Sequence, residues 1–166
     1  MSRVLQGVTG GISAYKACEL TRRLVLAGHE VIPIVTRGAE RFVTRETFEA
    51  LANAPKGETA YPHLVRADLL VIAPLTANTL GKLAHGLADD VLTEAALAHD
   101  GPVLVAPAMN DRMWAHPATR ANAELLRERG VEFEGPVEGE LAEGGQGLGR
   151  MAEPEAIFAR CQELLA

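Results

Sequence analysis

The stretch Val4-Leu5-Gln6-Gly7-Val8-Thr9-Gly10-Gly11 joins a short apolar run to a glycine turn near the start of the chain. Residues 12–27 then follow a helical pattern that Gly28 ends, and residues 31–35 form a second apolar, β-branched run. A strand, a tight turn, a helix and another strand in this order are typical of the unit from which parallel sheets are built.

The same alternation continues to the end of the chain. The further expected strands are 69–73, 103–106 and 131–133, and Pro74 is expected to end the first of them. The further expected helices are 39–54, 76–86, 88–99, 118–129 and 154–165. This alternation predicts an α/β fold, a three-layer, doubly wound parallel sheet sandwich of the Rossmann or flavodoxin-like type. Residues 139–149 are rich in glycine and are expected to be flexible.

The composition indicates a globular protein and excludes several partners. The 166 residues predict a single domain, 1–166, with 48% hydrophobic and 23% charged residues. A net charge of −6 argues against nucleic acid or an anionic membrane as partner. No apolar run reaches the roughly 20 residues that span a bilayer, and residues 1–8 lack a signal core. We therefore expect a cytoplasmic protein, with Cys18 and Cys161 reduced.

Polar or unusual residues follow four of the expected strands. These segments are Thr9–Ser13, Thr36-Arg37, Pro74–Thr79 and Pro107–Trp114. Ligands of open α/β sheets collect at the carboxyl ends of the strands, where such segments meet. The sequence therefore predicts one composite small-molecule site at this edge.

The first two segments favour phosphate binding. Gly10 and Gly11 let the backbone approach an anion, the start of the helix offers free N–H groups, and Ser13 and Thr36 add hydroxyls. The glycine spacing matches neither the dinucleotide fingerprint nor a P-loop. A tight strand-to-helix turn without a ligand is the alternative.

The other two segments also have a structural alternative. Thr76 or Asn78 could simply cap a helix, and Met109, Met113 and Trp114 could fill the core after a proline turn. As a site, Pro107–Trp114 offers large apolar side chains and the amide of Asn110 just past a strand.

Two further candidates lie outside these segments. His63, shortly before the third strand, could move a proton near neutral pH, or it could be an ordinary solvated histidine. Asp89-Asp90 could bind a metal, but no His or Cys stands at ligand spacing, so we expect no metal site.

Taken together, the chain resembles the homo-oligomeric flavin-containing cysteine decarboxylase family, and in particular the members that act on phosphopantothenoylcysteine. The matching segments, in order, are Gly7–Ile12, Ala14–Lys16, Thr47–Leu51, Ala67–Pro74, Thr76–Thr79, Lys82–Asp90, Pro107–Trp114 and Gly149–Met151. Pro107–Trp114 matches the family motif Pro-x-Met-Asn-x-x-Met-Trp in full.

The resemblance implies an FMN cofactor and a role for each matching residue. The residues implied to bind FMN are Gly10, Gly11, Ser13 and Thr36 at the phosphate, Thr76, Ala77, Asn78 and Thr79 at the ribityl chain and ring, and Ala108 and Met109 at the ring edge. The residues implied to bind substrate are Asn110, Met113, Arg150 and Met151, the last two in a flap. The implied catalytic residues are His63, Asn110 and Glu143.

The resemblance also implies the reaction and the assembly. It implies FMN-dependent decarboxylation of a small cysteinyl substrate, phosphopantothenoylcysteine, to phosphopantetheine, by a homotrimer or an assembly of trimers. The chain departs from the family pattern in the shortened segment 55–65, which moves His63, and in Glu143, which stands where those decarboxylases carry a flap cysteine. A peptidyl cysteine substrate, or a regulatory FMN-binding protein without activity, are the alternatives.

Overall fold

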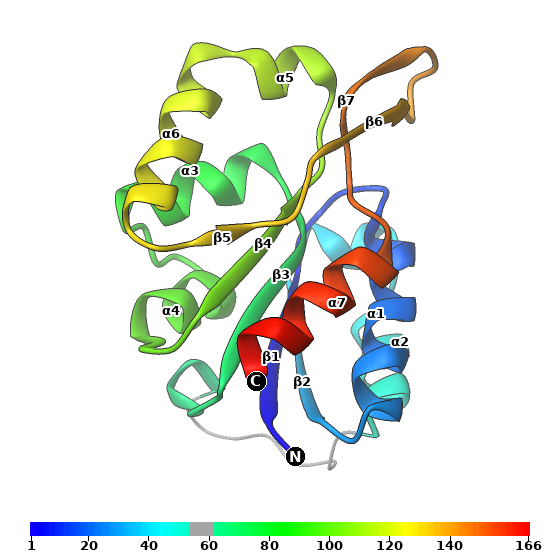
Figure 1. The fold of residues 1–166 in the computed structure, drawn as a ribbon, viewed down its shortest axis with the longest axis vertical. Coiled ribbons are helices and arrows are strands. Elements are labelled where there is room, and N and C mark those ends of the chain that lie inside the picture. Colours follow the sequence, from blue (N-terminus) through cyan, green and yellow to red (C-terminus); the bar gives the residue numbers. More distant parts are fainter. Residues whose placement is uncertain (54–61) are drawn as a thin grey trace.

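A computed structural model describes residues 1–53 and 62–166, and within these ranges a parallel sheet of five strands forms the centre. The strands follow the order β2-β1-β3-β4-β5 (Figure 1). Their bounds are β1 (Arg3–Val8), β2 (Glu30–Val35), β3 (Leu69–Leu75), β4 (Val103–Pro107) and β5 (Glu132–Phe133). This order is that of flavodoxin-like folds, so the predicted doubly wound sandwich is confirmed.

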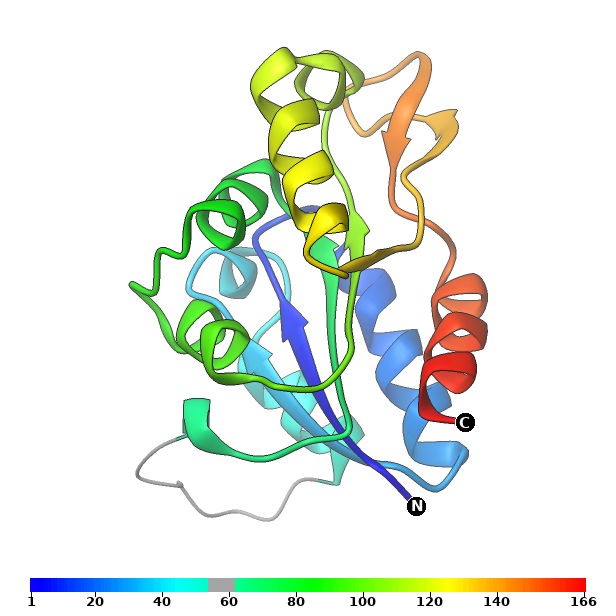
Figure 2. The same ribbon diagram turned by 60° about the vertical axis from the view of Figure 1, so that its left-hand side comes forward.

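Helices cover both faces of this sheet (Figures 1 and 2). One face carries α1 (Ala14–Leu26), α2 (Arg45–Ala52) and α7 (Pro154–Leu165). The other carries α3 (Ala77–His85), α4 (Val91–Ala98) and α6 (Pro117–Glu128), and the short helix α5 (Asp111–Ala115) follows β4. Two 3-10 helices, η1 (Ala39–Arg41) and η2 (Pro62–Leu64), complete the helical segments described.

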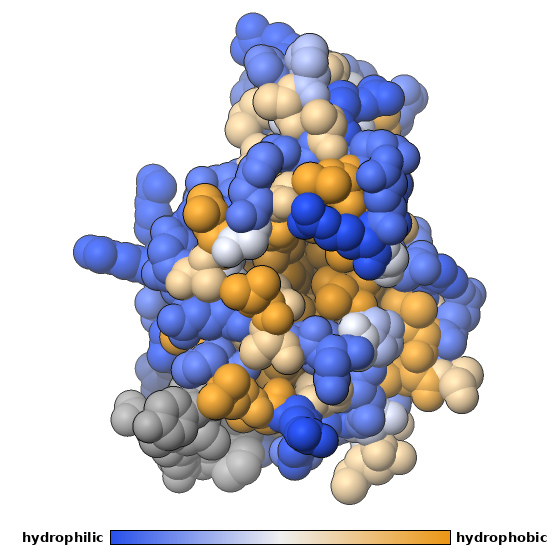
Figure 3. Space-filling view, turned by 90° about the vertical axis from the view of Figure 1, so that its left-hand side faces the viewer, coloured by the Kyte–Doolittle hydropathy of each residue, from blue (hydrophilic) through white to orange (hydrophobic). Residues whose placement is uncertain are grey.

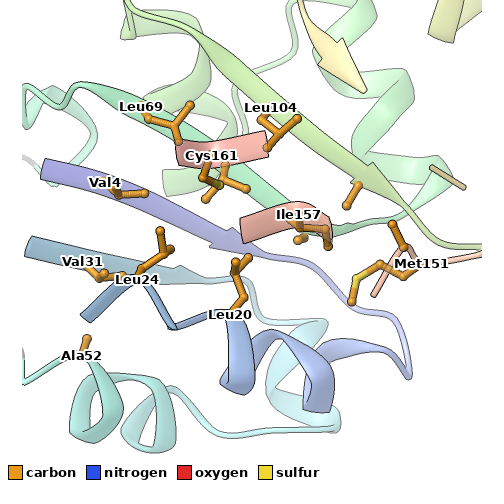
Figure 4. Close-up of a cluster of buried hydrophobic side chains, with 14 residues drawn as sticks. Val4, Leu20, Leu24, Val31, Ala52, Leu69, Leu104, Met151, Ile157 and Cys161 are labelled. Carbon is orange, nitrogen blue, oxygen red and sulfur yellow. The ribbon is translucent and has the colours of Figure 1, made fainter. Parts of the chain in front are cut away.

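The alternation of side chains along the strands divides the core between the two faces. In β3, Leu69 and Val71 pack towards α1 and α7, in the cluster that Figure 4 shows, whereas Leu70 and Ile72 pack towards α3 and α4. All of these side chains are fully buried. Burial on both faces is typical of a central parallel strand and explains why β3 reads as a continuous apolar run.

A buried polar contact fixes α1 on β1. The amide of Gln6, which is fully buried, donates to the carbonyl oxygen of Ala17 over 3.0 Å and accepts from the hydroxyl of Thr21 over 2.9 Å. Because a buried amide left without partners is costly, this contact holds the two elements in one position. It therefore places the start of α1 at the carboxyl end of β1.

Three expectations about local structure are wrong. The helix expected at 39–54 is interrupted, since η1 ends at Arg41 and Thr44, in an extended conformation, starts the separate helix α2. Pro74 does not end β3, because the strand continues to Leu75, which pairs with Pro107 of β4. The remaining helix and strand predictions hold within three residues at each end.

The third wrong expectation concerns the glycine-rich segment 139–149. It forms an antiparallel hairpin of β6 (Val137–Glu140) and β7 (Gln146–Arg150). In Figures 1 and 2 this hairpin stands beyond the carboxyl ends of the main strands, beside α5. Two of its glycines, Gly147 and Gly149, pack closely against residues 109–111. Of the helices in the described ranges, none is long and apolar enough to cross a membrane.

Candidate functional site

The candidate site lies where β1 and β3 end side by side. These strands are neighbours, but β1 is followed by a crossover to β2 at one side and β3 by a crossover to β4 at the other. Such a switch point opens a crevice at the carboxyl edge of a parallel sheet. Thr9 links the two ends: its hydroxyl donates to the carbonyl oxygen of Pro74 over 2.6 Å and accepts from the backbone N–H of Thr76 over 3.0 Å.

The glycine turn after β1 packs directly against the loop after β2. A Cβ atom on Gly10 would lie 2.9 Å from the carbonyl carbon of Gly38, so the two loops touch without side chains between them. The first turn of α1 holds no acidic residue, and its N-cap Ser13 makes no side-chain capping bond. The positive end of α1 and the half-buried Ser13 hydroxyl are therefore available to an anion.

Thr36, the other predicted phosphate contact, stands at the end of β2. Its N–H donates to the carbonyl oxygen of Val8 over 3.0 Å, which brings it next to the glycine turn. Its hydroxyl accepts from the N–H of Ala39 over 3.3 Å. This hydroxyl can still donate its own proton to a ligand.

The loop after β3 leads directly into α3. The hydroxyl of Thr76 accepts from the N–H of Thr79 over 3.2 Å, so the helix-cap interpretation is confirmed for Thr76. Thr79 is buried, Ala77 is half-buried, and Asn78 is exposed at the rim of the crevice. The structure therefore brings the four residues to the switch point, with Asn78 most open to a ligand.

The segment after β4 completes this edge of the sheet. The N–H of Ala108 donates to the carbonyl oxygen of Leu75 over 3.0 Å, and Asn110 caps α5 by accepting from the N–H of Arg112 over 2.9 Å. Trp114 is buried in the core cluster on the α3 and α6 side, as the structural alternative expected. Met113, in contrast, is 49% exposed, so this apolar side chain faces outward.

The β6–β7 hairpin packs on this segment through its glycines. A Cβ atom on Gly149 would lie 2.1 Å from the carbonyl oxygen of Met109, and one on Gly147 would lie 2.8 Å from Cβ of Asp111. The N–H of Met109 in turn donates to the carbonyl oxygen of Gly149 over 2.9 Å. Only glycine permits this close approach of β7 to the segment after β4.

Glu143 lies in that turn and contacts Asn110. The side-chain amide Nδ2 of Asn110 donates a hydrogen bond to Oε1 of Glu143. The two residues are 33 positions apart in the sequence, and both were predicted as catalytic residues from the family resemblance. The structure brings this pair together, at the end of β4.

Arg150 and Met151, the two predicted flap residues, have different surroundings. Nη2 of Arg150 lies 2.7 Å from Oε1 of Glu153, which also lies 2.9 Å from Nζ of Lys16 in the first turns of α1. The hydrogen bond from Lys16 holds the pKa of Glu153 below its ordinary value. Met151, which directly follows β7, is only 1% exposed and packs in the core.

His63 lies apart from all of these residues. It belongs to η2, which precedes β3, and its Nδ1 is 3.5 Å from Oε2 of Glu94 in α4. The seven residues of β3 extend over about 20 Å between η2 and Thr76. Figure 2 shows η2 at the amino end of the strand, away from the hairpin. One copy of the chain therefore does not bring His63 to Asn110. Residues 55–61 of the shortened segment before it lie outside the described residues.

The remaining candidates from the sequence have structural roles. Asp89 forms an ion pair with Lys82 over 2.9 Å, and Asp90 caps α4 by accepting from the N–H of Thr93 over 2.7 Å. Both cysteines are free, and burial raises the pKa of Cys161 to about 12. Within residues 1–53 and 62–166, no three His, Cys, Asp or Glu side chains are grouped as a metal site would require.

An apolar face lies on the α3, α4 and α6 side of the molecule, towards the amino end of β4. Exposed Leu87 and Leu97 line a groove of about 90 Å³ between α3, α4 and α6, and exposed Val91 is the first residue of α4. Figure 3 views this side of the molecule and shows apolar side chains around a hollow. Large exposed apolar side chains grouped in this way are typical of a protein–protein contact.

Comparison with known proteins identifies the family. The family model described as Flavoprotein matches residues 1–166. The coenzyme A biosynthesis bifunctional protein CoaBC of Bacillus subtilis (strain 168) is 46% identical over 174 residues, which cover 98% of this chain and 43% of that protein. The chain thus spans less than half the length of the curated relatives that it matches.

Two solved structures are similar over nearly their whole length. One is a cysteine-to-serine variant of a PPC decarboxylase complexed with pantothenoylaminoethenethiol, with a TM-score of 0.85 and 35% identity over 97% of this chain and 96% of that one. The other is the FMN binding protein AtHal3, with a TM-score of 0.82 and 35% identity over 98% of this chain and 95% of that one.

Proposed function

The chain belongs to the flavoprotein family, and on that premise we propose that residues 1–166 form an FMN-binding domain that decarboxylates phosphopantothenoylcysteine to phosphopantetheine in coenzyme A synthesis. The observation that carries this proposal is the switch point, where Thr9 joins the turn after β1 to the loop after β3 and Ala108, after β4, bonds to Leu75 at the end of β3. The relatives named above, CoaBC and PPC decarboxylase, support the choice of substrate.

The residues at the switch point fit the cofactor. Gly10, Gly11, Ser13 and the open start of α1 would hold the FMN phosphate, together with the hydroxyl of Thr36. A protein with a net charge of −6 would here bind an anion through backbone N–H groups and a helix terminus. Residues 76–79 would hold the ribityl chain and ring, with 108 and 109 at the ring edge. When bound, FMN would supply the oxidation of the cysteinyl thiol.

Asn110 would bind the substrate carboxylate, and His63 would take up the thiol proton. The Nδ2 group of Asn110 already donates to a carboxylate, that of Glu143, which supports its proposed bond to the substrate carboxylate. His63 would accept the proton of the substrate thiol, because histidine is the side chain that most often serves as a general base. Oxidation of the thiol to a thioaldehyde places a C=S group β to the carboxylate, so loss of CO₂ leaves a delocalised enethiolate. Met113 and Arg150 would line the substrate pocket.

The separation of His63 from Asn110 supports a shared site between copies of the chain. In the proposed homotrimer, or assembly of trimers, His63 of one copy would reach the strand ends of the next. The apolar face with Leu87, Val91 and Leu97 would be covered in that contact. Each copy would contribute His63 to one neighbour and its strand ends to the other. The contact would therefore be heterologous, and the copies would form a closed ring.

Glu143 affects the last step of the proposed reaction. A carboxylate can deliver a proton, but it cannot undergo the thiol chemistry of a cysteine. Neither Cys18 of α1 nor Cys161 of α7 belongs to the hairpin. Reduction of the enethiolate is therefore expected to be slow in this protein, and Glu143→Cys should increase the saturated product. The proposed place of action is the cytoplasm, where both thiols stay reduced.

The test uses the purified protein with added substrate. We expect yellow protein that releases FMN on denaturation and forms CO₂ and an enethiol from phosphopantothenoylcysteine without oxygen, as measured by mass spectrometry. Colourless protein that takes up no FMN would end this proposal. Turnover of a peptide with a C-terminal cysteine in place of phosphopantothenoylcysteine would support the peptidyl alternative. Bound FMN with neither turnover would support a regulatory protein.

A further inference from the structure

The turn of the β6–β7 hairpin places a carboxylate on the amide of Asn110. The hairpin lies close to the backbone of residues 109–111, because side chains at Gly147 and Gly149 would collide with Asp111 and Met109. Glu143, in the turn, accepts the hydrogen bond from Nδ2 of Asn110. The packing of β7 against residues 109–111 therefore brings the exposed turn of the hairpin to the amide of Asn110.

The amide of Asn110 offers one group to a ligand. Its Oδ1 atom accepts from the N–H of Arg112 over 2.9 Å, so a ligand acceptor can bind only at Nδ2, which has two N–H groups and donates one of them to Glu143. A ligand carboxylate that binds the other N–H would therefore lie beside the carboxylate of Glu143. Two carboxylates at one neutral amide repel each other, and the side chain of Asp111 next to Gly147 adds a third negative charge nearby.

We propose that Glu143 is a specificity-determining residue that occupies the carboxylate subsite of Asn110 until the carboxylate of a ligand displaces it. The proposal rests on the proposed function, since it takes a cysteinyl carboxylate as the ligand group. The apparent dissociation constant of the ligand is then its intrinsic value divided by the fraction of molecules in which Glu143 has left Asn110. A hydrogen bond to a charged group corresponds to a factor of about ten or more.

The test separates the carboxylate from the rest of the ligand. The FMN-loaded protein is titrated calorimetrically with phosphopantothenoylserine, whose hydroxyl replaces the reactive thiol, and with phosphopantothenoylethanolamine, which lacks the carboxylate. The variants are Glu143→Ala and Glu143→Gln, and the matched control is Glu138→Gln, which removes an exposed carboxylate from β6 of the same hairpin. Melting temperatures check that each variant is folded.

The expected result is a change limited to one ligand. Glu143→Ala should bind the serine compound about tenfold more tightly than the unaltered protein, with a smaller gain for Glu143→Gln, which keeps an acceptor oxygen. The ethanolamine compound should bind equally to all four proteins. Equal tightening of both ligands, or no tightening in folded variants, would overturn the proposal. Protein that binds neither FMN nor ligand would instead contradict the proposed function.

Discussion

The hydroxyl of Thr9 and the carbonyl oxygen of Pro74 are 2.6 Å apart. This hydrogen bond joins the ends of β1 and β3, the neighbouring strands whose crossovers run to opposite sides of the sheet. The same hydroxyl accepts from the N–H of Thr76, the residue that caps α3. Thr9 is only 1% exposed, so water cannot replace it as a partner. The side chain and the backbone N–H of Thr9 therefore both hold the predicted phosphate turn against the predicted ring-binding loop.

We expect Thr9→Val to destabilise the protein and to weaken FMN binding. Valine fills the same space but leaves the partly buried N–H of Thr76 without its acceptor, which costs about 1 kcal/mol. Urea unfolding of the FMN-free protein measures the stability, and a fluorescence titration measures FMN affinity. Thr9→Ser keeps the hydroxyl and serves as the control. An unchanged free energy of unfolding in Thr9→Val would show that the two strand ends are held by other contacts.

Gly149→Ala should detach the hairpin without loss of FMN. Its Cβ atom would lie 2.1 Å from the carbonyl oxygen of Met109, a distance that requires the backbone of β7 to move. We expect faster proteolysis within residues 137–150 and weaker binding of the cysteinyl substrate, while the flavin absorbance spectrum is retained. In the control Gly81→Ala, the new Cβ meets Nδ2 of Asn122 at an ordinary 3.5 Å. Equal protease resistance of both variants would contradict this account of the hairpin.

The layers of the fold follow directly from the sequence pattern. Short apolar runs such as 69–72, followed by a proline, favour strands buried on both faces, and this signal is local in the sequence. The break in the helix expected at 39–54 and the place of Pro74 depend on tertiary neighbours. Thr44 starts a second helix, and Pro74 stays in β3 because Thr9 bonds to its carbonyl oxygen and Leu75 pairs with Pro107. Propensity alone does not contain those contacts.

The candidate site was predictable only where its residues follow strands. Because parallel strands end at one edge, the sequence places Ser13, Thr76 and Asn110 together without knowledge of their distances. The hairpin was missed because glycine indicates flexibility as readily as close packing. Glu153 was missed as well: its partner Lys16 is 137 positions away, and no local pattern joins the two residues.

Replacement of Glu153 should show a defined pH dependence. The hydrogen bond from Lys16 lowers the pKa of Glu153 in the folded protein, so the ion pair stabilises the fold above the ordinary carboxyl range. This contribution is lost as the pH falls through the lowered pKa. Glu153→Gln should therefore be less stable than the unaltered protein at pH 7, by at most about 1 kcal/mol because the pair is partly exposed, and the difference should vanish in acid. Thermal unfolding between pH 7 and pH 3 measures it. A difference that grows as the pH falls would contradict the assignment, and Glu138→Gln is the control.

The distance between His63 and Asn110 leads to a test of the shared site. His63→Asn should retain FMN but lose about 10²–10⁴-fold in thiol oxidation, as expected for a missing base. Asn110→Asp keeps the acceptor that caps α5 but replaces the Nδ2 donor by a charge, so it should fail to bind the substrate carboxylate. Each variant alone should be inactive.

When the two variants are coexpressed and mix at random, about a quarter of the sites between copies should combine an intact His63 with an intact Asn110. Activity of coexpressed protein, compared with separately purified variants mixed without exchange, measures this recovery. If coexpression restores no activity while mixed oligomers are present, His63 does not complete the site of a neighbouring copy.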